Sequence, residues 1–409
     1  MRTLNGQNIV NVKNHNRQAI LLQLLRTPLS RVELAHKLDL SSTTVTNLIN
    51  ELLAEKWVIP TNADDASFHK SGRGRPRTKL QLNRTARYVL AVHLGIGSYR
   101  LGQVDLTGHL IATAAATFPP TQPATTTLNT IATHLQAFIN THNLNHDQLL
   151  GLGFGASGLV NHTTGHNTYA PNLDWHNVPI APFLQEQLNL PVIVENNVRA
   201  MALAESYFGH GRDRHSLAFI YGRIGIGAGL VTRGRLARGH HGGAGEIGHT
   251  IILPTNGTPC RCGQSGCLET LVTQTTLSQK LRHYPLTATM FTHEDDPIAQ
   301  FEHILQLARD GDTFILDALT DIAFYLGIAL SNLINTTNPQ QIILGGMYAQ
   351  GADIFLPLLR QHIAQKSFGH LGHNLPLETA TFGLDTGLVG AATVALLKLF
   401  YEDSHTINA

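Results

Sequence analysis

The chain has 409 residues, a length that predicts two or three domains. Its hydrophobic content of 43% is enough for sizeable cores. No continuous apolar run reaches the roughly 18 residues of a membrane-spanning helix, and the N-terminal residues lack the apolar segment of a signal peptide. We therefore expect a cytoplasmic protein with no membrane partner. Residues 1–90 hold 14 basic and 6 acidic residues, whereas the rest holds 15 and 22. A basic head on an acidic body predicts that the head meets a polyanion.

Three short helices are predicted before residue 57. Residues 14–27 place four apolar side chains at helical spacing, namely Ile20, Leu21, Leu24 and Leu25. Ser30, followed three residues later by Glu33, is the pattern of a capping box that opens a second helix. Ser41 or Ser42 can cap a third helix, whose buried stripe is formed by Val45, Leu48, Ile49 and Leu52. Three such helices with a tight turn between the second and third predict a helix-turn-helix.

The outer face of the third helix carries short polar side chains. A helix in the major groove of DNA needs such side chains to reach the base edges, and asparagine pairs well with adenine. The candidates for DNA contact on this helix are Ser42, Thr43, Thr44, Thr46 and Asn47. An ordinary three-helix bundle would also fit the helices alone.

A basic hairpin after the third helix favours DNA binding over a plain bundle. We expect strands over 57–60 and 79–83, flanking a polar loop rich in Gly and Arg. In this loop Arg73, Arg75 and Arg77 alternate with Gly and Pro, forming an extended basic segment suited to phosphates or the minor groove. Residues 1–85 are therefore predicted to be a winged helix-turn-helix domain that binds double-stranded operator DNA.

From residue 87 onward strands and helices alternate, which predicts an α/β body. The elements expected there are two or three strands over 88–118, a Thr-rich loop over 121–130, a helix over 131–142, buried strands over 149–160, 190–197, 217–232 and 340–347, and a final helix over 387–400.

All three cysteines of the chain, Cys260, Cys262 and Cys267, lie within eight residues. An odd number without a secretion signal argues against a disulfide framework and for a metal site. Together with His249 they offer one imidazole and three thiolates, a set that suits tetrahedral Zn²⁺. Four protein ligands leave no open coordination position, so the zinc is expected to be structural.

The run GIGAGLVTRGRLARGHHGGAGEIGHT, followed by CRCGQSGCLET, resembles the signature of the ROK family of repressors, open reading frames and kinases. The resemblance extends over almost the whole chain. It implies a two-lobed, actin-like and sugar-kinase-like (ribonuclease H-like) ATPase fold, with lobe I over 86–196, completed by a C-terminal helix at about 385–409, and lobe II, with the zinc site, over 197–384. Members with a DNA-binding head are repressors, including xylose repressors and N-acetylglucosamine-type regulators, so the head favours that branch.

The resemblance implies a sugar site at six positions, namely Gly158, Asn196, Asn197, Glu246, His249 and Glu269. Carboxylates and amides of this kind exchange hydrogen bonds with neighbouring sugar hydroxyls. His249 is expected to bind zinc through one ring nitrogen and a sugar hydroxyl through the other, so that the metal fixes the orientation of the ring. Asn172 is a further candidate, although Pro-Asn is also common in turns.

Three positions depart from the pattern of the kinase members. Asn197 stands where they have the catalytic aspartate, and its amide cannot act as a base. His93 replaces the leading acid of the D-x-G-x-T phosphate element, and Arg223-Ile224-Gly225 replaces a GTG loop. The body is therefore expected to bind a sugar without phosphorylating it.

The predicted function is a sugar-responsive transcriptional repressor that binds a palindromic operator as a homodimer or a dimer of dimers. Sugar binding between the lobes is expected to alter the relative placement of the two heads. Two alternatives stay open: an ATP-dependent sugar kinase with a DNA-binding appendage, and a repressor released by a protein partner instead of a sugar.

Overall fold

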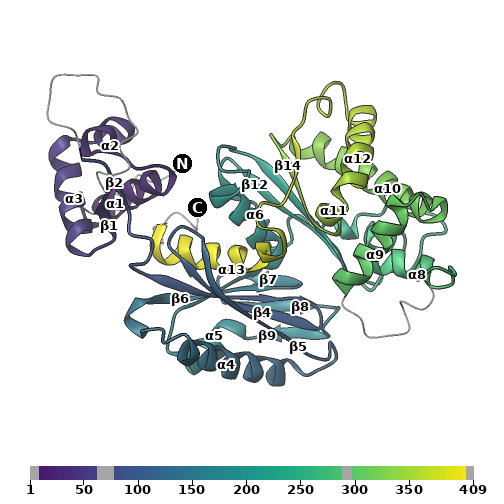
Figure 1. Ribbon diagram of the computed structural model, residues 1–409, viewed down its shortest axis with the longest axis horizontal. Helices are drawn as coiled ribbons and strands as arrows, with labels where there is room; N and C mark the ends of the chain where they lie inside the picture. The colour runs from purple at the N-terminus through teal and green to yellow at the C-terminus, as the bar shows by residue number, and fades with distance from the viewer. Residues whose placement is uncertain (1–8, 62–77, 288–296, 402–409) are drawn as a thin grey trace.

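The computed structural model describes residues 9–61, 78–287 and 297–401, which form a small head and a two-lobed body (Figure 1). The head lies at one end of the molecule, next to the C-terminal helix of the chain. Three of the predicted DNA contacts, Arg73, Arg75 and Arg77, fall outside the described residues.

The head combines three helices with a two-stranded antiparallel hairpin. Its elements are α1 (Ile9–Arg26), α2 (Arg31–Leu38), α3 (Ser42–Ala54), β1 (Val58–Pro60) and β2 (Leu80–Leu82). The predicted capping box is present, because the Glu33 amide donates to the Ser30 hydroxyl and the Ser30 amide donates to the Glu33 carboxylate. Ser41, one of the two predicted candidates, caps α3. The predicted stripe of Val45, Leu48, Ile49 and Leu52 is buried in the head.

Lobe I is a five-stranded mixed sheet with helices on both faces. Its strands, in spatial order, are β10 (Val192–Asn196), β6 (Leu149–Ala156), β3 (Tyr88–Leu94), β4 (Ser98–Asp105) and β5 (Leu110–Thr117). Helices α4 (Ala124–Thr141) and α5 (Ile180–Leu188) cover one face, and α13 (Thr386–Leu396) covers the other (Figure 1). Because side chains alternate along a strand, Val89 and Ala91 of β3 pack toward α13, whereas Leu90 and Val92 pack toward α4 and α5. A smaller sheet beside it contains β7 (Leu159–Asn161), β8 (His166–Ala170) and β9 (Trp175–Val178).

Lobe II repeats this layered plan around a second five-stranded sheet. Its strands, in spatial order, are β13 (Arg235–Leu236), β12 (Ile226–Thr232), β11 (Leu217–Gly222), β14 (Ile342–Gly346) and β15 (Leu377–Thr379). Helices α10 (Thr313–Thr337) and α12 (Ala352–Lys366) pack on one face, and α6 (Asn197–Phe208) packs on the other. The shorter helices are α7 (Glu269–Val272), α8 (Gln274–Leu281), α9 (Pro297–Arg309) and α11 (Met347–Gln350).

Helix α6 joins the two lobes, because it packs against both the second sheet and α13. The two helices approach closely at Gly390, where a Cβ atom would lie 2.7 Å from the backbone of Ala200. Beyond α13 the chain forms one π-helical turn (Leu397–Tyr401) that reaches the head. There the ring centroid of Phe400 lies 4.7 Å from that of Trp57. The guanidinium of Arg212 also donates to the Leu25 carbonyl of α1 at 2.8 Å. Head and body are therefore in direct contact.

The prediction of a loop over 121–130 is wrong for most of its length, because α4 already begins at Ala124. Threonine disfavours helices in isolation. Here Thr130 and Thr133 donate their hydroxyl protons to the carbonyls of Thr126 and Asn129, four residues earlier. Thr127 and Leu128 are buried against the sheet of lobe I. Tertiary packing of this face outweighs the local preference.

Two helices, Thr313–Thr337 and Gly383–Tyr401, are long and apolar enough to span a membrane by length and composition. Within their apolar windows 50% and 72% of the residues are buried inside the protein. Core helices of soluble proteins have the same composition, so these segments are explained by the packing of lobe I and lobe II.

Candidate DNA, metal and sugar sites

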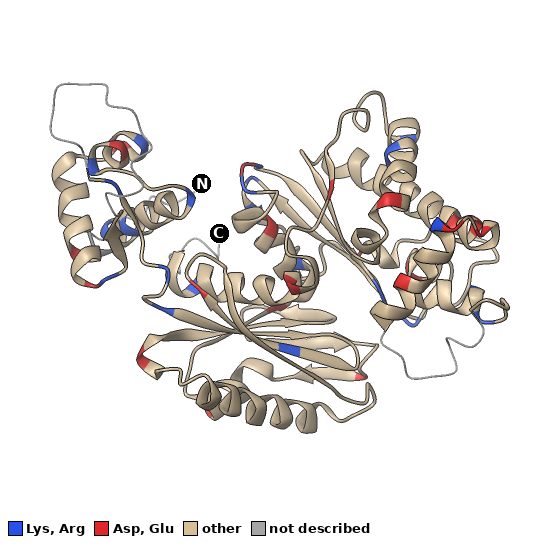
Figure 2. Cartoon of the chain, in the orientation of Figure 1, with Lys and Arg blue, Asp and Glu red and all other residues tan. Residues whose placement is uncertain are grey.

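The outer face of α3 presents the residues that are predicted to contact DNA. Ser42, Thr43 and Asn47 are exposed, whereas Thr44 and Thr46 are half-buried. The Thr44 hydroxyl lies 2.8 Å from that of Ser41 and so takes part in the cap of α3. Lys and Arg residues are spread over the head around this helix (Figure 2). Short polar side chains on an exposed helix face are what a major-groove contact requires.

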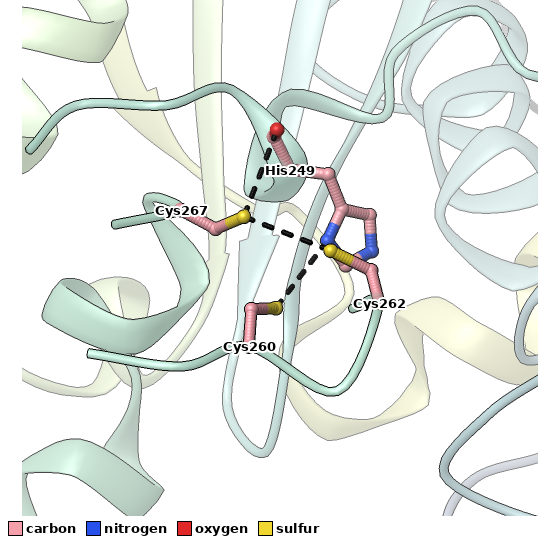
Figure 3. Close-up of side chains that lie close together, drawn as sticks. All are labelled: His249, Cys260, Cys262 and Cys267. Atoms are coloured by element: carbon pink, nitrogen blue, oxygen red, sulfur yellow. Dashed lines mark hydrogen bonds between the residues drawn. The ribbon is translucent and has the colours of Figure 1, made fainter. Parts of the chain in front are cut away.

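The four predicted zinc ligands converge on one point (Figure 3). His249 ends a short 3-10 turn, and the three cysteines come from the loop that precedes α7. One ligand atom from each residue lies within 4.8 Å of all the others. The His249 Nδ1 is 3.7 Å from the Cys260 sulfur, and the Cys262 sulfur is 3.7 Å from that of Cys267. Since Nδ1 faces the sulfurs, Nε2 is left on the other side of the ring.

The chemistry of this cluster fits a divalent metal. Burial, and then the neighbouring thiols of Cys262 and Cys260, raise the pKa of Cys267 to about 12. A soft divalent cation offsets this penalty because it binds sulfur as the thiolate. The loop turns at Gly266, which has φ +74 and lies against the Leu253 carbonyl, so a side chain there would be both strained and crowded.

The lobe II candidates for sugar binding lie beside the metal ligands. Burial raises the pKa of Glu246 against the opposing charges of Arg199 and His249, and the Glu269 carboxylate adds a smaller effect in the same direction as burial. The Glu269 Oε2 accepts from the Ile226 amide at 3.3 Å. A Cβ on Gly225 would lie 2.6 Å from this oxygen, so the absence of a side chain keeps the approach to Glu269 open.

The lobe I candidates are held at the junction of β10 and α6. Asn196 caps α6, because its Oδ1 accepts from the amides of Val198 and Arg199 at 3.0 and 3.1 Å. Its Nδ2 donates to the Gly158 carbonyl at 2.9 Å. Both polar atoms of the Asn196 side chain therefore have structural partners. Asn197, the first residue of α6, is half-buried and its Nδ2 lies 3.4 Å from the Ser157 hydroxyl.

A contact across the candidate sugar site involves Asn172, the further candidate from the sequence. Arg261, which lies between two of the cysteines, donates to the Asn172 Oδ1 at 2.8 Å. The Asn172 amide is also 4.0 Å from the position of a Cβ on Gly225. Arg261 was not predicted, because only the fold brings the zinc loop against residue 172.

A buried ion cluster behind Asn196 also escaped the sequence reasoning. The Glu195 carboxylate receives the Nε protons of Arg199 and Arg238 at 3.1 and 2.7 Å. Arg199 also donates to the carbonyls of Gly242 and Ala244, in the loop that leads to Glu246. Glu195 and Arg199 are each 1% exposed. Their i,i+4 spacing was the signal available in the sequence, whereas Arg238 is distant along the chain.

The ROK family profile matches residues 89–398. The chain belongs to the ROK family. The xylose repressor of Caldicellulosiruptor bescii is 29% identical over 90% of this chain and 92% of its own length. A solved ROK family transcriptional regulator, a homologue of the E. coli MLC protein, has a TM-score of 0.78 and 29% identity over 94% of this chain and 96% of its own.

The actin-like, sugar-kinase-like fold class predicted for this ROK protein is confirmed by solved relatives. A ROK family glucokinase from Streptomyces griseus, in complex with glucose and AMPPNP, matches with a TM-score of 0.65 and 28% identity. It covers 76% of this chain and 100% of its own. The regulators match almost all of this chain, and the family profile begins only after the head.

At the second position where ROK kinases were expected to differ, the structure holds His93 against α13. A Cβ on Gly387 would lie 2.5 Å from the His93 ring, and burial, followed by the Arg100 charge, lowers the pKa of His93 to about 4. The imidazole is therefore neutral near pH 7. At the third position, Arg223 donates to Gln274 and Gln350 at 3.1 and 3.3 Å. Its guanidinium is thus tied to the first residue of α8 and the last residue of α11.

Proposed function

We propose that this ROK protein is a transcriptional repressor whose operator affinity is controlled by a sugar. The observation that carries the proposal is a helix-turn-helix in direct contact with a ROK body. The outer face of its third helix, α3, carries short polar side chains and is partly exposed. Similarity to a xylose repressor and to a solved regulator across both parts supports it. We assign the head to residues 1–85, lobe I to 86–196 with about 385–409, and lobe II to 197–384.

Zn²⁺ is the metal that His249, Cys260, Cys262 and Cys267 would hold. When bound it supplies a structural cross-link between the 3-10 turn and the loop before α7. The support is the donor set and its convergence within 4.8 Å. The imidazole of His249 then keeps a fixed tautomer, and its Nε2 is aimed at a ligand in the candidate sugar site.

The sugar would bind between Asn197, at the junction of the two lobes, and Glu246, His249 and Glu269 of lobe II. The two carboxylates accept hydroxyl protons, and the Asn197 amide donates. We assign Gly158 and Asn196 a positioning role, because the Asn196 side chain already caps α6 and holds the Gly158 carbonyl. The glucokinase from S. griseus was solved with glucose bound. For this chain we propose a sugar as the ligand class.

We further propose that the body is not an enzyme. The amide of Asn197 cannot accept the proton of a sugar hydroxyl, and loss of a general base costs roughly 10²–10⁴ in rate. His93 offers no carboxylate for a metal ion, and the Arg223 side chain is tied to Gln274 and Gln350. A cytoplasmic repressor that binds a palindromic operator as a homodimer, or as a dimer of dimers, fits this set of features.

A continuous chain of packed elements connects the sugar site to the head. Asn197 begins α6, α6 packs on α13 at Gly390, and the turn after α13 places Phe400 on Trp57. A ligand that favours one arrangement of the lobes would move the head through this contact. The shift in the equilibrium between the two arrangements is set by the difference in the ligand's affinity for them.

Asn47→Ala is expected to weaken operator binding by about 5- to 150-fold, because a bidentate base contact is worth roughly 1–3 kcal/mol. Binding would be measured by fluorescence anisotropy at fixed salt on the operator recovered by selection from random DNA. Asn129→Ala, at an exposed asparagine of α4, is the control and should bind as the parent does. Equal affinity of parent and Asn47→Ala for that operator would contradict the assignment of α3.

Glu269→Gln is expected to lower sugar affinity about tenfold or more, since a hydrogen bond to a charged group is worth roughly 1.5–3 kcal/mol. The sugar would first be found by a thermal-shift screen of sugars and their phosphates. Operator release would then be titrated with that sugar for the parent, Glu269→Gln and the surface control Glu186→Gln. No response of the parent to any sugar would contradict the proposal, and ATP-dependent phosphorylation of a sugar would favour a kinase.

A further inference from the structure

A cavity of about 1180 Å³ lies where the head meets both lobes. Helix α1 of the head forms one wall, and β10, α5 and the end of α13 form the lobe I wall. The turn between β12 and β13 and the segment after β13 close it from lobe II. It is separate from the candidate sugar site, because none of Glu246, His249 and Glu269 lines it.

Several basic side chains line this cavity. Its cationic or titratable basic residues are His15, His162, Arg233, Arg235, Arg238, His240 and Lys398. Among the described residues Glu195 is the one acidic residue of the lining, and its two oxygens accept from Arg199 and Arg238. The lining thus carries an excess of positive charge.

In the described part of the chain, three of these cations have no acidic partner. Within residues 9–61, 78–287 and 297–401, no ion pair involves Arg233, Arg235 or Lys398. The positive charges also act on His162 in the same lining. Burial, followed by the charge of Arg238, lowers the pKa of His162. Arg199 and Lys398 lower this pKa further, whereas Glu195 raises it. Arg233 and Arg235 are exposed and Lys398 is half-buried, so an anion that enters the cavity from solvent can reach all three charges.

We propose that this cavity binds a small phosphate-bearing metabolite, a phosphate monoester held by Arg233, Arg235 and Lys398. Arginine forks match phosphate oxygens and lysine contributes a point charge. Hydroxyl groups of Thr163 and Thr164 on the same lining can meet the alcohol part of the ester. A volume of this size admits a whole metabolite, not the phosphate group alone.

Such a ligand would act on the head, because the walls of the cavity belong to the head and to both lobes. Binding stabilises the placement of α1 seen in this structure relative to any placement that opens the cavity. The binding step stands independently of the proposed repressor function, and only its effect on operator affinity rests on that function.

The test is isothermal titration calorimetry of the full chain, at constant ionic strength, with glycerol 3-phosphate, a hexose 6-phosphate and inorganic phosphate. The double variant Arg233→Gln/Lys398→Gln is expected to lose about tenfold or more in affinity for the ester, since each charged hydrogen bond is worth roughly that factor. Arg282→Gln, which removes one positive charge at an exposed arginine of lobe II outside this lining, is the control and should leave binding unchanged. Thermal unfolding would verify that the double variant stays folded.

The arms of this titration separate the sources of phosphate. Tighter binding of either ester than of inorganic phosphate supports a metabolite, and preference for inorganic phosphate overturns the ester but keeps an anion site. Absence of binding at millimolar concentrations overturns the proposal. So does an equal loss in Arg282→Gln, which would indicate unspecific charge attraction, or a loss in Glu269→Gln alone, which would place the ester in the sugar site. A change in operator affinity on adding the ester, absent in the double variant, would establish the coupling.

Discussion

Cys267→Ser is expected to remove bound zinc and to destabilise lobe II by several kcal/mol. Structural zinc in small peptides binds with roughly 10–16 kcal/mol, and that free energy is coupled to folding because the unfolded chain has no preformed site. Cys267 is fully buried and precedes the buried Leu268, so the serine cannot relax toward solvent. Metal content by mass spectrometry and thermal unfolding with and without a chelator would measure both effects.

Ser265→Ala, in the same loop but outside the ligand set, should keep its zinc and its melting temperature. A chelator should lower the melting temperature of the parent and of this control, and leave Cys267→Ser unchanged. Cys267→Ser should also weaken sugar binding, because loss of the metal removes the partner that orients the His249 ring. A parent protein that contains no zinc, or a variant as stable as the parent, would refute the metal assignment.

Glu195→Gln is expected to cost roughly 3–5 kcal/mol, because removing one member of a buried ion pair leaves the others uncompensated. Arg199 is 1% exposed and would face a neutral amide, and Arg238 would lose its charged acceptor at 2.7 Å. Since Arg199 also holds the carbonyl of Gly242, the loop leading to Glu246 should loosen and sugar affinity should fall. Glu302→Gln, which breaks a surface pair with Arg309, is the matched control and should cost about 0–1 kcal/mol.

This buried cluster also predicts a pH dependence of stability. Burial alone would raise the pKa of Glu195, but the charges of Arg199 and Arg238 and their hydrogen bonds outweigh it and hold the pKa below the usual 4.5. A carboxyl with a depressed pKa stabilises the folded state above its ordinary range and loses that contribution as pH falls through its folded pKa. Urea unfolding of the parent should therefore show stability falling below about pH 4.5. A parallel fall in Glu195→Gln would show that other carboxyls are responsible.

Local patterns predicted the parts of this protein whose determinants lie close together in the sequence. The capping box of Ser30 and Glu33 and the buried stripe of α3 depend on contacts within one helix and its neighbours, so periodicity was sufficient. The three cysteines lie within eight residues, so a common metal could be proposed before any fold was known. The signature around His249 identified the family and, through it, the two lobes.

Other features depend on contacts between distant segments, and no local pattern encodes them. The Thr-rich segment from Ala124 is helical because Thr127 and Leu128 pack on the sheet, which outweighs a weak intrinsic preference. The pairing of Arg261 with Asn172 and of Arg238 with Glu195 requires the two lobes to be assembled. Composition and motifs by themselves predicted a basic head expected to bind DNA, a cluster of potential zinc ligands and a ROK body. The tertiary structure alone decided which side chains share a site and how the head joins the body, because burial and charge proximity arise only when remote segments meet.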